Sequence, residues 1–156
     1  VMNARAYYAR CEELSQLAQR SGQPYAVLFV DLDHFKQIND THGHPVGDVV
    51  LRHLAASVRE QLRHSVDWMA RYGGEEFLVV LPETSLDSAV ATAERLRARI
   101  AAEVIALDDG LSLTVTSSFG VTACREGDDS ASLLARADAL LYEAKQAGRN
   151  RVASSA

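Results

Sequence analysis

The sequence predicts an α/β protein, of the α+β kind, in which helices pack on a central and largely antiparallel sheet. Short runs rich in Val, Leu and Phe have the composition and length of buried strands. Two of these runs are separated by Gly73 and Gly74, which is typical of a β-hairpin. Three longer segments repeat apolar residues at three- and four-residue steps, as amphipathic helices do. This order of elements indicates one sheet covered by helices.

The expected elements can be placed in order along the chain. The opening stretch VMNARAYYARCEEL is helix-like, and PYAVLFVDLDHF contains a strand over residues 26–31. The later elements are a helix over 46–63, strands over 68–72 and 76–81 joined by a type I′ turn at Gly73 and Gly74, a helix from its cap Ser85 to Glu103, a strand over 111–124, a helix over 130–148 that Gly148 ends, and a short strand over 150–154.

Length and composition indicate a single domain over residues 1–156, with 47% hydrophobic and 24% charged residues. The net charge of −5 argues against a general nucleic-acid surface, so an anionic ligand needs a locally basic or metal-filled site. Cys11 and Cys124 are far apart in sequence and have the character of free thiols of a reducing compartment. The chain has no run of about 18 apolar residues and opens on no signal peptide, so we expect a cytoplasmic fragment of a longer polypeptide.

Acidic residues lie where two of the predicted strands meet loops. Asp31 and Asp33 end the first strand, and Lys36 follows shortly after. Glu75 and Glu76 follow the two glycines of the hairpin, which the turn alone does not explain. Mg²⁺ prefers one or two carboxylates together with substrate phosphates. Each group alone could be explained by acids in contact with water at a strand end or by a plain hairpin turn, but together they indicate a metal and phosphate site.

Other polar residues could complete such a site. Lys145 and Arg149 are four residues apart at the end of the last helix, where they could cap the helix or bind phosphates. Between the first strand and the next helix lie Asn39, His44 and Asp48. His34, His42 and His44 have no cysteine nearby, which disfavours a zinc site.

Four blocks of the sequence resemble the signature blocks of GGDEF domains, the diguanylate cyclases, in their order and spacing. The blocks are DLDHFKQINDTHGHPVGD, RYGGEEF, SSFGV and ADALLYEAKQAGRNRV, and together they cover nearly the whole chain. The resemblance implies a five-stranded sheet like that of nucleotidyl cyclases and polymerase palm domains. It also implies condensation of two GTP into cyclic di-GMP and two pyrophosphates, by a homodimer that uses Mg²⁺ or Mn²⁺, with two ions in each half-site.

The resemblance also implies roles for individual residues. Asp31, the carbonyl of Leu32 and Glu75 match the metal ligands, and Glu75 is also the suspected general base. Lys36 matches a lysine that stabilises charge during phosphoryl transfer. The remaining matches are Asn39 and Asp48 for guanine, His44 for the lining of the substrate site, Gly73 and Gly74 for close approach of the nucleotide, Lys145 and Arg149 for the triphosphate, and Glu76 for an acid beside the metal ligand.

The sequence departs from the family at a product-binding inhibitory site of the form Arg-x-x-Asp. Asp67 occupies the aspartate position, but His64 takes the place of the arginine and Arg63 is one residue too early. On a helix end this shift rotates a side chain by about 100°, so we expect the site to be weak or absent. Arg95 matches a secondary arginine of the site and is a remnant or a surface charge. Cyclic di-GMP could still inhibit by occupying the active half-site.

The start of the chain departs from the family too, because Ala4 follows Asn3 where arginine is common. We therefore expect an N-terminal sensory domain outside this chain, and neither nucleic acid nor direct membrane insertion. Two other interpretations stay open. One is a catalytically silent GGDEF-type module that binds GTP or cyclic di-GMP, and the other is an unrelated α/β domain. Asp31, Glu75 and Glu76 are all present, which favours the active cyclase.

Overall fold

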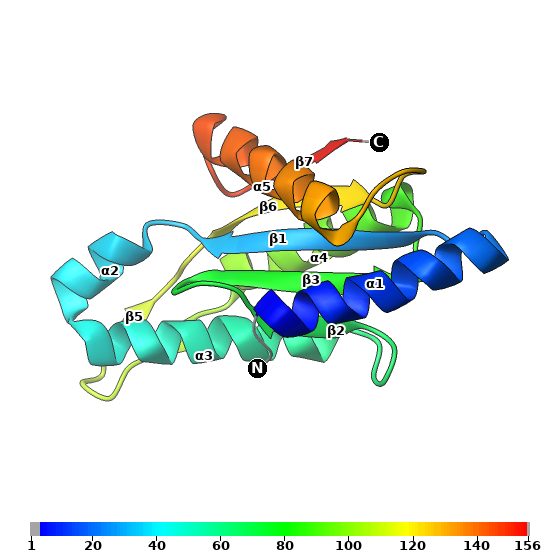
Figure 1. Ribbon diagram of the computed structural model, residues 1–156. Coiled ribbons are helices and arrows are strands. Elements are labelled where there is room, and N and C mark those ends of the chain that lie inside the picture. The colour runs from blue at the N-terminus through cyan, green and yellow to red at the C-terminus, as the bar shows by residue number, and fades with distance from the viewer. Residues whose placement is uncertain (1–3, 156) are drawn as a thin grey trace.

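The computed structural model describes residues 4–155 and contains one central sheet with helices on both faces (Figure 1). The helices are α1 (Ala4–Ser21), α2 (Phe35–His42), α3 (His44–Gln61), α4 (Leu86–Ala102) and α5 (Ser130–Gln146). The strands are β1 (Tyr25–Leu32), β2 (Trp68–Arg71), β3 (Glu76–Pro82), β4 (Ile105–Ala106), β5 (Ser112–Leu113), β6 (Ser117–Ala123) and β7 (Val152–Ser155).

The central sheet has five strands in the order β2-β3-β1-β6-β7. All neighbouring strands are antiparallel except β6 and β7, which run parallel. The predicted fold class, a largely antiparallel five-stranded sheet flanked by helices, is therefore confirmed. Strands β4 and β5 form a separate two-stranded hairpin.

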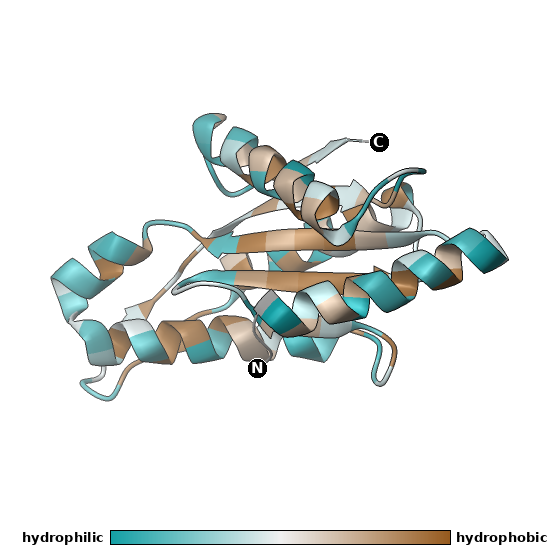
Figure 2. Ribbon diagram, in the orientation of Figure 1, coloured by the Kyte–Doolittle hydropathy of each residue, from teal (hydrophilic) through white to brown (hydrophobic). Residues whose placement is uncertain are grey.

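Strand β1 is the middle of the sheet, and all eight of its residues are buried. Its side chains alternate between the two faces, as the pleat requires. Leu28 and Val30 pack with α3 and α4, whereas Val27 and Phe29 pack with α1 and α5. Figure 2 shows the result, with apolar residues along β1 and β3 and hydrophilic residues on the outer sides of the helices. A strand buried on both faces explains why its sequence is a continuous apolar run.

Helix α5 packs directly on β6 at Gly120. A Cβ atom at this residue would lie 2.2 Å from the carbonyl oxygen of Ala137 and 2.5 Å from the backbone nitrogen of Leu141. Only glycine permits this approach of a helix to a strand. Asp129 begins α5 with a capping box, and Ser85 caps α4 by accepting from the Ser88 N–H at 3.2 Å, as predicted.

Several predicted boundaries were wrong. The single strand over 111–124 is divided into β5 and β6, because Ser112 and Leu113 pair with β4 and residues 114–116 pair with no strand. The helix predicted over 46–63 already begins at His44, with Pro45 in its first turn, and ends at Gln61. A short helix over Phe35–His42, α2, was not predicted at all. The last strand is Val152–Ser155 rather than 150–154.

The glycine turn also differs from its prediction. The strands pair as far as Arg71 and Phe77, and the N–H of Tyr72 donates to the Glu76 carbonyl at 2.9 Å, so the turn is longer than two residues. Gly73 and Gly74 do not have the positive φ that a type I′ turn requires.

The helix expected at the start of the chain is α1, which begins at Ala4, where the family commonly has arginine, whereas Asn3 lies outside the described residues. Over residues 4–155, no helix has both the length and the apolar character needed to cross a membrane. Cys11 and Cys124 are free thiols, as expected.

Candidate active site

The end of β1 and the β2–β3 hairpin bring the predicted acidic residues together. Asp31 pairs in register with Glu76 on β3, and the N–H of Leu32 donates to the Glu75 carbonyl at 3.4 Å. Glu75 therefore lies across from the residue after Asp31, at the same edge of the sheet. The hairpin thus lies beside β1, which brings the two acidic stretches of the sequence together.

Six predicted residues line one open cavity of about 290 Å³ at this edge. They come from the end of β1, the start of α2, the hairpin, the end of α5 and the turn that follows α5. The six are Asp31, Leu32, Lys36, Glu75, Lys145 and Arg149. Asp33, which was not predicted as a site residue, also lines the cavity. Three acids and three cations around one cavity form a site that can hold a polyanion together with a metal ion.

Lys145 and Arg149 both line this cavity, but, contrary to the prediction, they do not lie on one side of a helix. Helix α5 ends at Gln146, so the two residues are not on one turn of a helix. Gly148, Arg149 and Asn150 all have positive φ, of 124°, 65° and 46°. This left-handed turn reverses the chain, and the N–H of Arg149 donates to the carbonyl of Ala144 at 3.0 Å. Lys145 makes an ion pair with Asp31.

Asp31 has the properties of a ligand for a hard cation. Its side chain is buried, and among the described residues its Oδ1 has no hydrogen-bond partner. Burial raises the pKa of Asp31, Glu75 adds to the rise by repulsion, and Lys145 opposes it. An unpaired buried oxygen next to a second carboxylate is relieved by a bound metal ion.

The carboxylates fit Mg²⁺ better than they fit a metal held by protein alone. Within residues 4–155, no three His, Cys, Asp or Glu side chains are grouped as a metal cage. Mg²⁺ uses one or two carboxylates and takes its other ligands from phosphates and water. Asp31, Glu75 and the Leu32 carbonyl suit this coordination.

A second open cavity of about 350 Å³ contains Asp48. Phe77, which follows Glu75 by two residues, and Arg71 also line it. Asn39 lies close to Gly47, because a Cβ at Gly47 would be 1.9 Å from Asn39 Oδ1. This Oδ1 is buried without a hydrogen-bond partner among the described residues, so it is available to a ligand.

Not every predicted residue lines these two cavities. Asn39, His44, Gly73 and Gly74 line neither of them. His44 begins α3, after Gly43. At Gly74 a Cβ would have no neighbouring atom within 4 Å, so the chain's own packing does not require this glycine.

Arg71 is a residue that sequence reasoning missed. Its guanidinium donates to the carbonyl oxygens of Gly73 at 3.3 Å and Gly74 at 2.6 Å, and thereby holds the turn that presents Glu75. The only signal in the sequence was its position two residues before the glycines.

Contrary to our expectation, the residues at the position of the Arg-x-x-Asp inhibitory site are not on a helix end. Because α3 ends at Gln61, Arg63 lies in the following turn and not on a helix end. Its Nη2 donates to Asp67 Oδ1 at 2.6 Å, and its backbone N–H donates to Asp67 Oδ2 at 2.7 Å. The same Nη2 donates to the carbonyl oxygen of Pro82 at 2.8 Å. Arg95 instead donates to Gln61 at 3.3 Å. The carboxylate of Asp67 is thus already hydrogen-bonded to Arg63 of the same chain.

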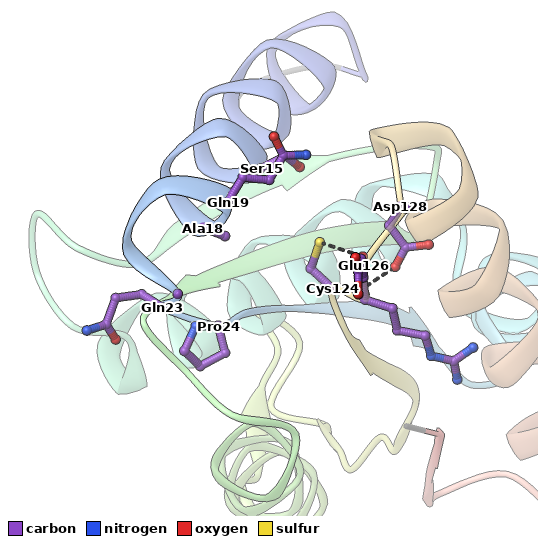
Figure 3. A pocket seen from close by; sticks show the side chains of 11 residues that line it. Ser15, Ala18, Gln19, Gln23, Pro24, Cys124, Glu126 and Asp128 are labelled. Atoms are coloured by element: carbon purple, nitrogen blue, oxygen red, sulfur yellow. Dashed lines mark hydrogen bonds between the residues drawn. The ribbon is translucent and has the colours of Figure 1, made fainter.

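A cavity of about 420 Å³ lies at the other end of β1, far from the predicted residues (Figure 3). It is formed by the end of α1, the turn before β1 and the loop from Cys124 to Asp128. No predicted site residue lines it, so we place the active site at the acidic edge of the sheet.

Comparison with known proteins gives the same result over nearly the whole chain. The family model described as "Diguanylate cyclase, GGDEF domain" matches residues 1–151. Response regulator PleD of Caulobacter vibrioides is 42% identical over 156 residues, which are 99% of this chain and 34% of that protein. Diguanylate cyclase A of Treponema denticola is 47% identical over 131 residues, 83% of this chain and 35% of that protein.

Solved structures share the fold. The GGDEF domain of DgcB from Caulobacter crescentus, in complex with c-di-GMP, superposes with a TM-score of 0.92 at 31% identity, over 97% of this chain and 90% of that chain. The chain spans about a third of the length of these two curated relatives. On the strength of the matched family model and these relatives, the chain belongs to the family of GGDEF domains.

Proposed function

We propose that this domain is a diguanylate cyclase that condenses two GTP molecules into cyclic di-GMP and releases two pyrophosphates. The observation that carries the proposal is the cavity in which Asp31 and Glu75 face Lys36, Lys145 and Arg149. The reaction consists of two such condensations, one at each GTP. In each, the 3′-hydroxyl oxygen of one nucleotide forms a bond to the α-phosphorus of the other, the bond from that phosphorus to the pyrophosphate oxygen breaks, and the hydroxyl proton is transferred to a base.

We assign the metal ligands to Asp31, the Leu32 carbonyl and Glu75, for Mg²⁺ or Mn²⁺, with two ions in each half-site. Such ions lower the pKa of the attacking hydroxyl and neutralise charge on the phosphates. We also assign to Glu75 the role of the base that accepts the proton of the hydroxyl. Glu76 lies opposite Asp31, and burial followed by repulsion from Asp31 raises its pKa. We give Glu76 no role in the proton transfer.

The cations of the cavity bind the triphosphate and stabilise the charge that develops on it. Lys145 and Arg149 bind the phosphates, and Lys36 stabilises the charge during transfer. Phosphoryl transfer depends mainly on such positioning and charge stabilisation. Lys145 is paired with Asp31 in the structure, so a metal ion on Asp31 would free this ammonium for a phosphate.

Asn39 and Asp48 hydrogen-bond guanine in this proposal. The carboxylate of Asp48 can accept from the N1–H and N2–H₂ groups of guanine, which adenine lacks, and this difference selects GTP over ATP. His44 lines the bound nucleotide. Gly73 and Gly74 let the backbone approach it, because no Cβ atom intervenes.

Each domain provides one half-site, so we propose that two domains face each other as a homodimer during the reaction. A sensory domain N-terminal to this one would control how often the two half-sites meet. We place the reaction in the cytoplasm.

The experiment is incubation of the domain with GTP and Mg²⁺, with nucleotides separated by chromatography. We expect cyclic di-GMP and pyrophosphate to appear together. Glu75→Gln should reduce turnover by at least a factor of about 100, because a metal ligand and a base are removed together. The matched control is Glu126→Gln, at the distant cavity, which should have normal turnover.

Two results would separate the alternatives. If the domain binds GTP or cyclic di-GMP tightly but forms no product at any protein concentration, it is a silent binding module. If Glu75→Gln turns over normally, the metal assignment is wrong.

A further inference from the structure

The second aspartate of the DLD stretch, Asp33, is buried and has every carboxylate oxygen in use. It lies just beyond β1 and is 4% exposed. Its Oδ1 accepts from the Ser118 hydroxyl at 2.6 Å, and its Oδ2 accepts from the Thr116 hydroxyl at 2.7 Å. Asp31, two residues earlier, has the opposite character, because its Oδ1 is unpaired among the described residues. The carboxylate of Asp33 is therefore bound by the protein itself, although Asp33 also lines the cavity.

A third donor to Asp33 comes from the segment that follows α5. The backbone N–H of Asn150 donates to Asp33 Oδ2 at 2.9 Å. Asn150 belongs to the left-handed turn 148–150, in which Arg149 and Asn150 have positive φ without being glycines. Such a backbone costs free energy and persists only where the surroundings hold it. The contact with Asp33 is one of those that stabilise this backbone. Another is Arg97, which donates to Asn150 Oδ1 at 3.0 Å.

This contact joins the two parts of the active site that must keep a fixed separation. The end of β1 carries Asp31, and the turn carries Arg149, with Lys145 just before it. The two parts are 114 residues apart between Asp31 and Lys145. Asp33 links them through one backbone hydrogen bond to a charged acceptor, which is stronger than a neutral one.

We propose that Asp33 is a positioning residue that anchors the left-handed turn 148–150 to β1 and thereby pre-organises Arg149 for the triphosphate. In this proposal Asp33 acts through the turn and is not a ligand of the metal or the nucleotide. The proposal rests on the proposed binding of GTP in this cavity. Loss of the anchor should weaken binding of a triphosphate and leave binding of a monophosphate almost unchanged.

The first experiment measures dissociation constants for 3′-deoxy-GTP, which cannot condense, and for GMP, both with Mg²⁺. We expect Asp33→Asn to weaken 3′-deoxy-GTP about tenfold and GMP less than about twofold, since pre-organisation is lost only for the phosphates that Arg149 binds. Ser118→Ala is the matched control, because it removes a hydrogen bond to Asp33 but keeps the one to Asn150. It should leave the ratio of the two constants unchanged.

The second experiment is a double-mutant cycle between Asp33→Asn and Arg149→Ala. If Asp33 acts through Arg149, the double variant should bind 3′-deoxy-GTP no more weakly than Arg149→Ala alone. Multiplicative losses in the cycle, or an equal loss for GMP and 3′-deoxy-GTP, would assign Asp33 a general structural role and overturn the proposal. If the unaltered domain binds neither nucleotide, it is the proposed function that fails.

A third measurement does not require any variant to fold. Hydrogen exchange of the unaltered domain should show the Asn150 amide protected about as well as the Asp33 amide, which donates to the Thr116 carbonyl at 2.9 Å. Exchange of the Asn150 amide at the rate of an open loop would also overturn the proposal.

Discussion

Replacement of Gly120 by alanine tests the contact between α5 and the sheet. A Cβ at this position would lie 2.2 Å from the Ala137 oxygen and 2.5 Å from the Leu141 nitrogen, whereas ordinary contact begins at 3.4 Å. Both neighbours are backbone atoms, so no side chain can rotate away and α5 itself has to move by roughly 1 Å. Overpacking of this kind costs about 1–3 kcal/mol. For a domain of this size, that lowers the melting temperature by about 2–12 °C.

The assay is thermal unfolding followed by circular dichroism, with Gly74→Ala as the control. A Cβ at Gly74 would have no atom within 4 Å, and the φ angle of Gly74 is not positive. The free energy of unfolding of Gly74→Ala should therefore differ from that of the unaltered domain by less than about 0.5 kcal/mol. Because α5 leads to Lys145 and Arg149, Gly120→Ala should also reduce turnover, by up to about 100-fold for a shift of 1 Å. A melting temperature within about 1 °C of the unaltered domain would refute this account of the packing.

Three further predictions concern the site. Gly74→Ala should weaken GTP binding about tenfold although it leaves stability unchanged, and equal affinity would show that the nucleotide does not approach this glycine. Gly47→Ala should displace the side chain of Asn39, whose Oδ1 would lie 1.9 Å from the new Cβ, and should weaken GTP binding by about 1–3 kcal/mol. Titration calorimetry measures GTP affinity for both variants. Unchanged affinity of Gly47→Ala would contradict the role of Asn39. Burial raises the pKa of Asp31 above its ordinary value of 3.8. Without metal, ionisation of this carboxyl should therefore lower the free energy of unfolding as the pH rises above 3.8, and Asp31→Asn should remove that part of the pH dependence of the melting temperature. Identical pH profiles for the unaltered domain and Asp31→Asn would exclude this effect of Asp31.

The sequence was sufficient for the elements that carry strong local signals. The apolar run of β1, the periodicity of α3, α4 and α5, and the Ser85 cap were all predicted close to their positions. Helix α2 was missed because Phe35 and Ile38 are its apolar residues, and none of its residues is fully buried. The division of the strand over 111–124 depends on pairing with β4, which alternation along one segment does not reveal.

For the site, residue types and spacing predicted which groups gather, but not how they are held. Lys145 and Arg149 line one cavity, but the prediction that they lie on one side of a helix was wrong, because the helix ends before Arg149. The proposed role of Asp33 depends on a hydrogen bond from the backbone of Asn150, which is far away in the sequence, and that of Arg71 on a hydrogen bond to the carbonyl oxygen of Gly74 in the hairpin turn. Such bonds depend on tertiary geometry, which a pattern of side chains does not encode.

The position of Asp31 on the middle strand has a consequence for how such a domain can be switched. β1 is hydrogen-bonded on both sides, to β3 and β6, and is buried on both faces. Amides in such a strand open only when the whole domain unfolds, so its carboxylate is as durable as the fold itself. If a sensory domain controls this one, as proposed, it would therefore gain little by loosening or tightening this part of the site. Its effective control would be over how often one domain encounters another.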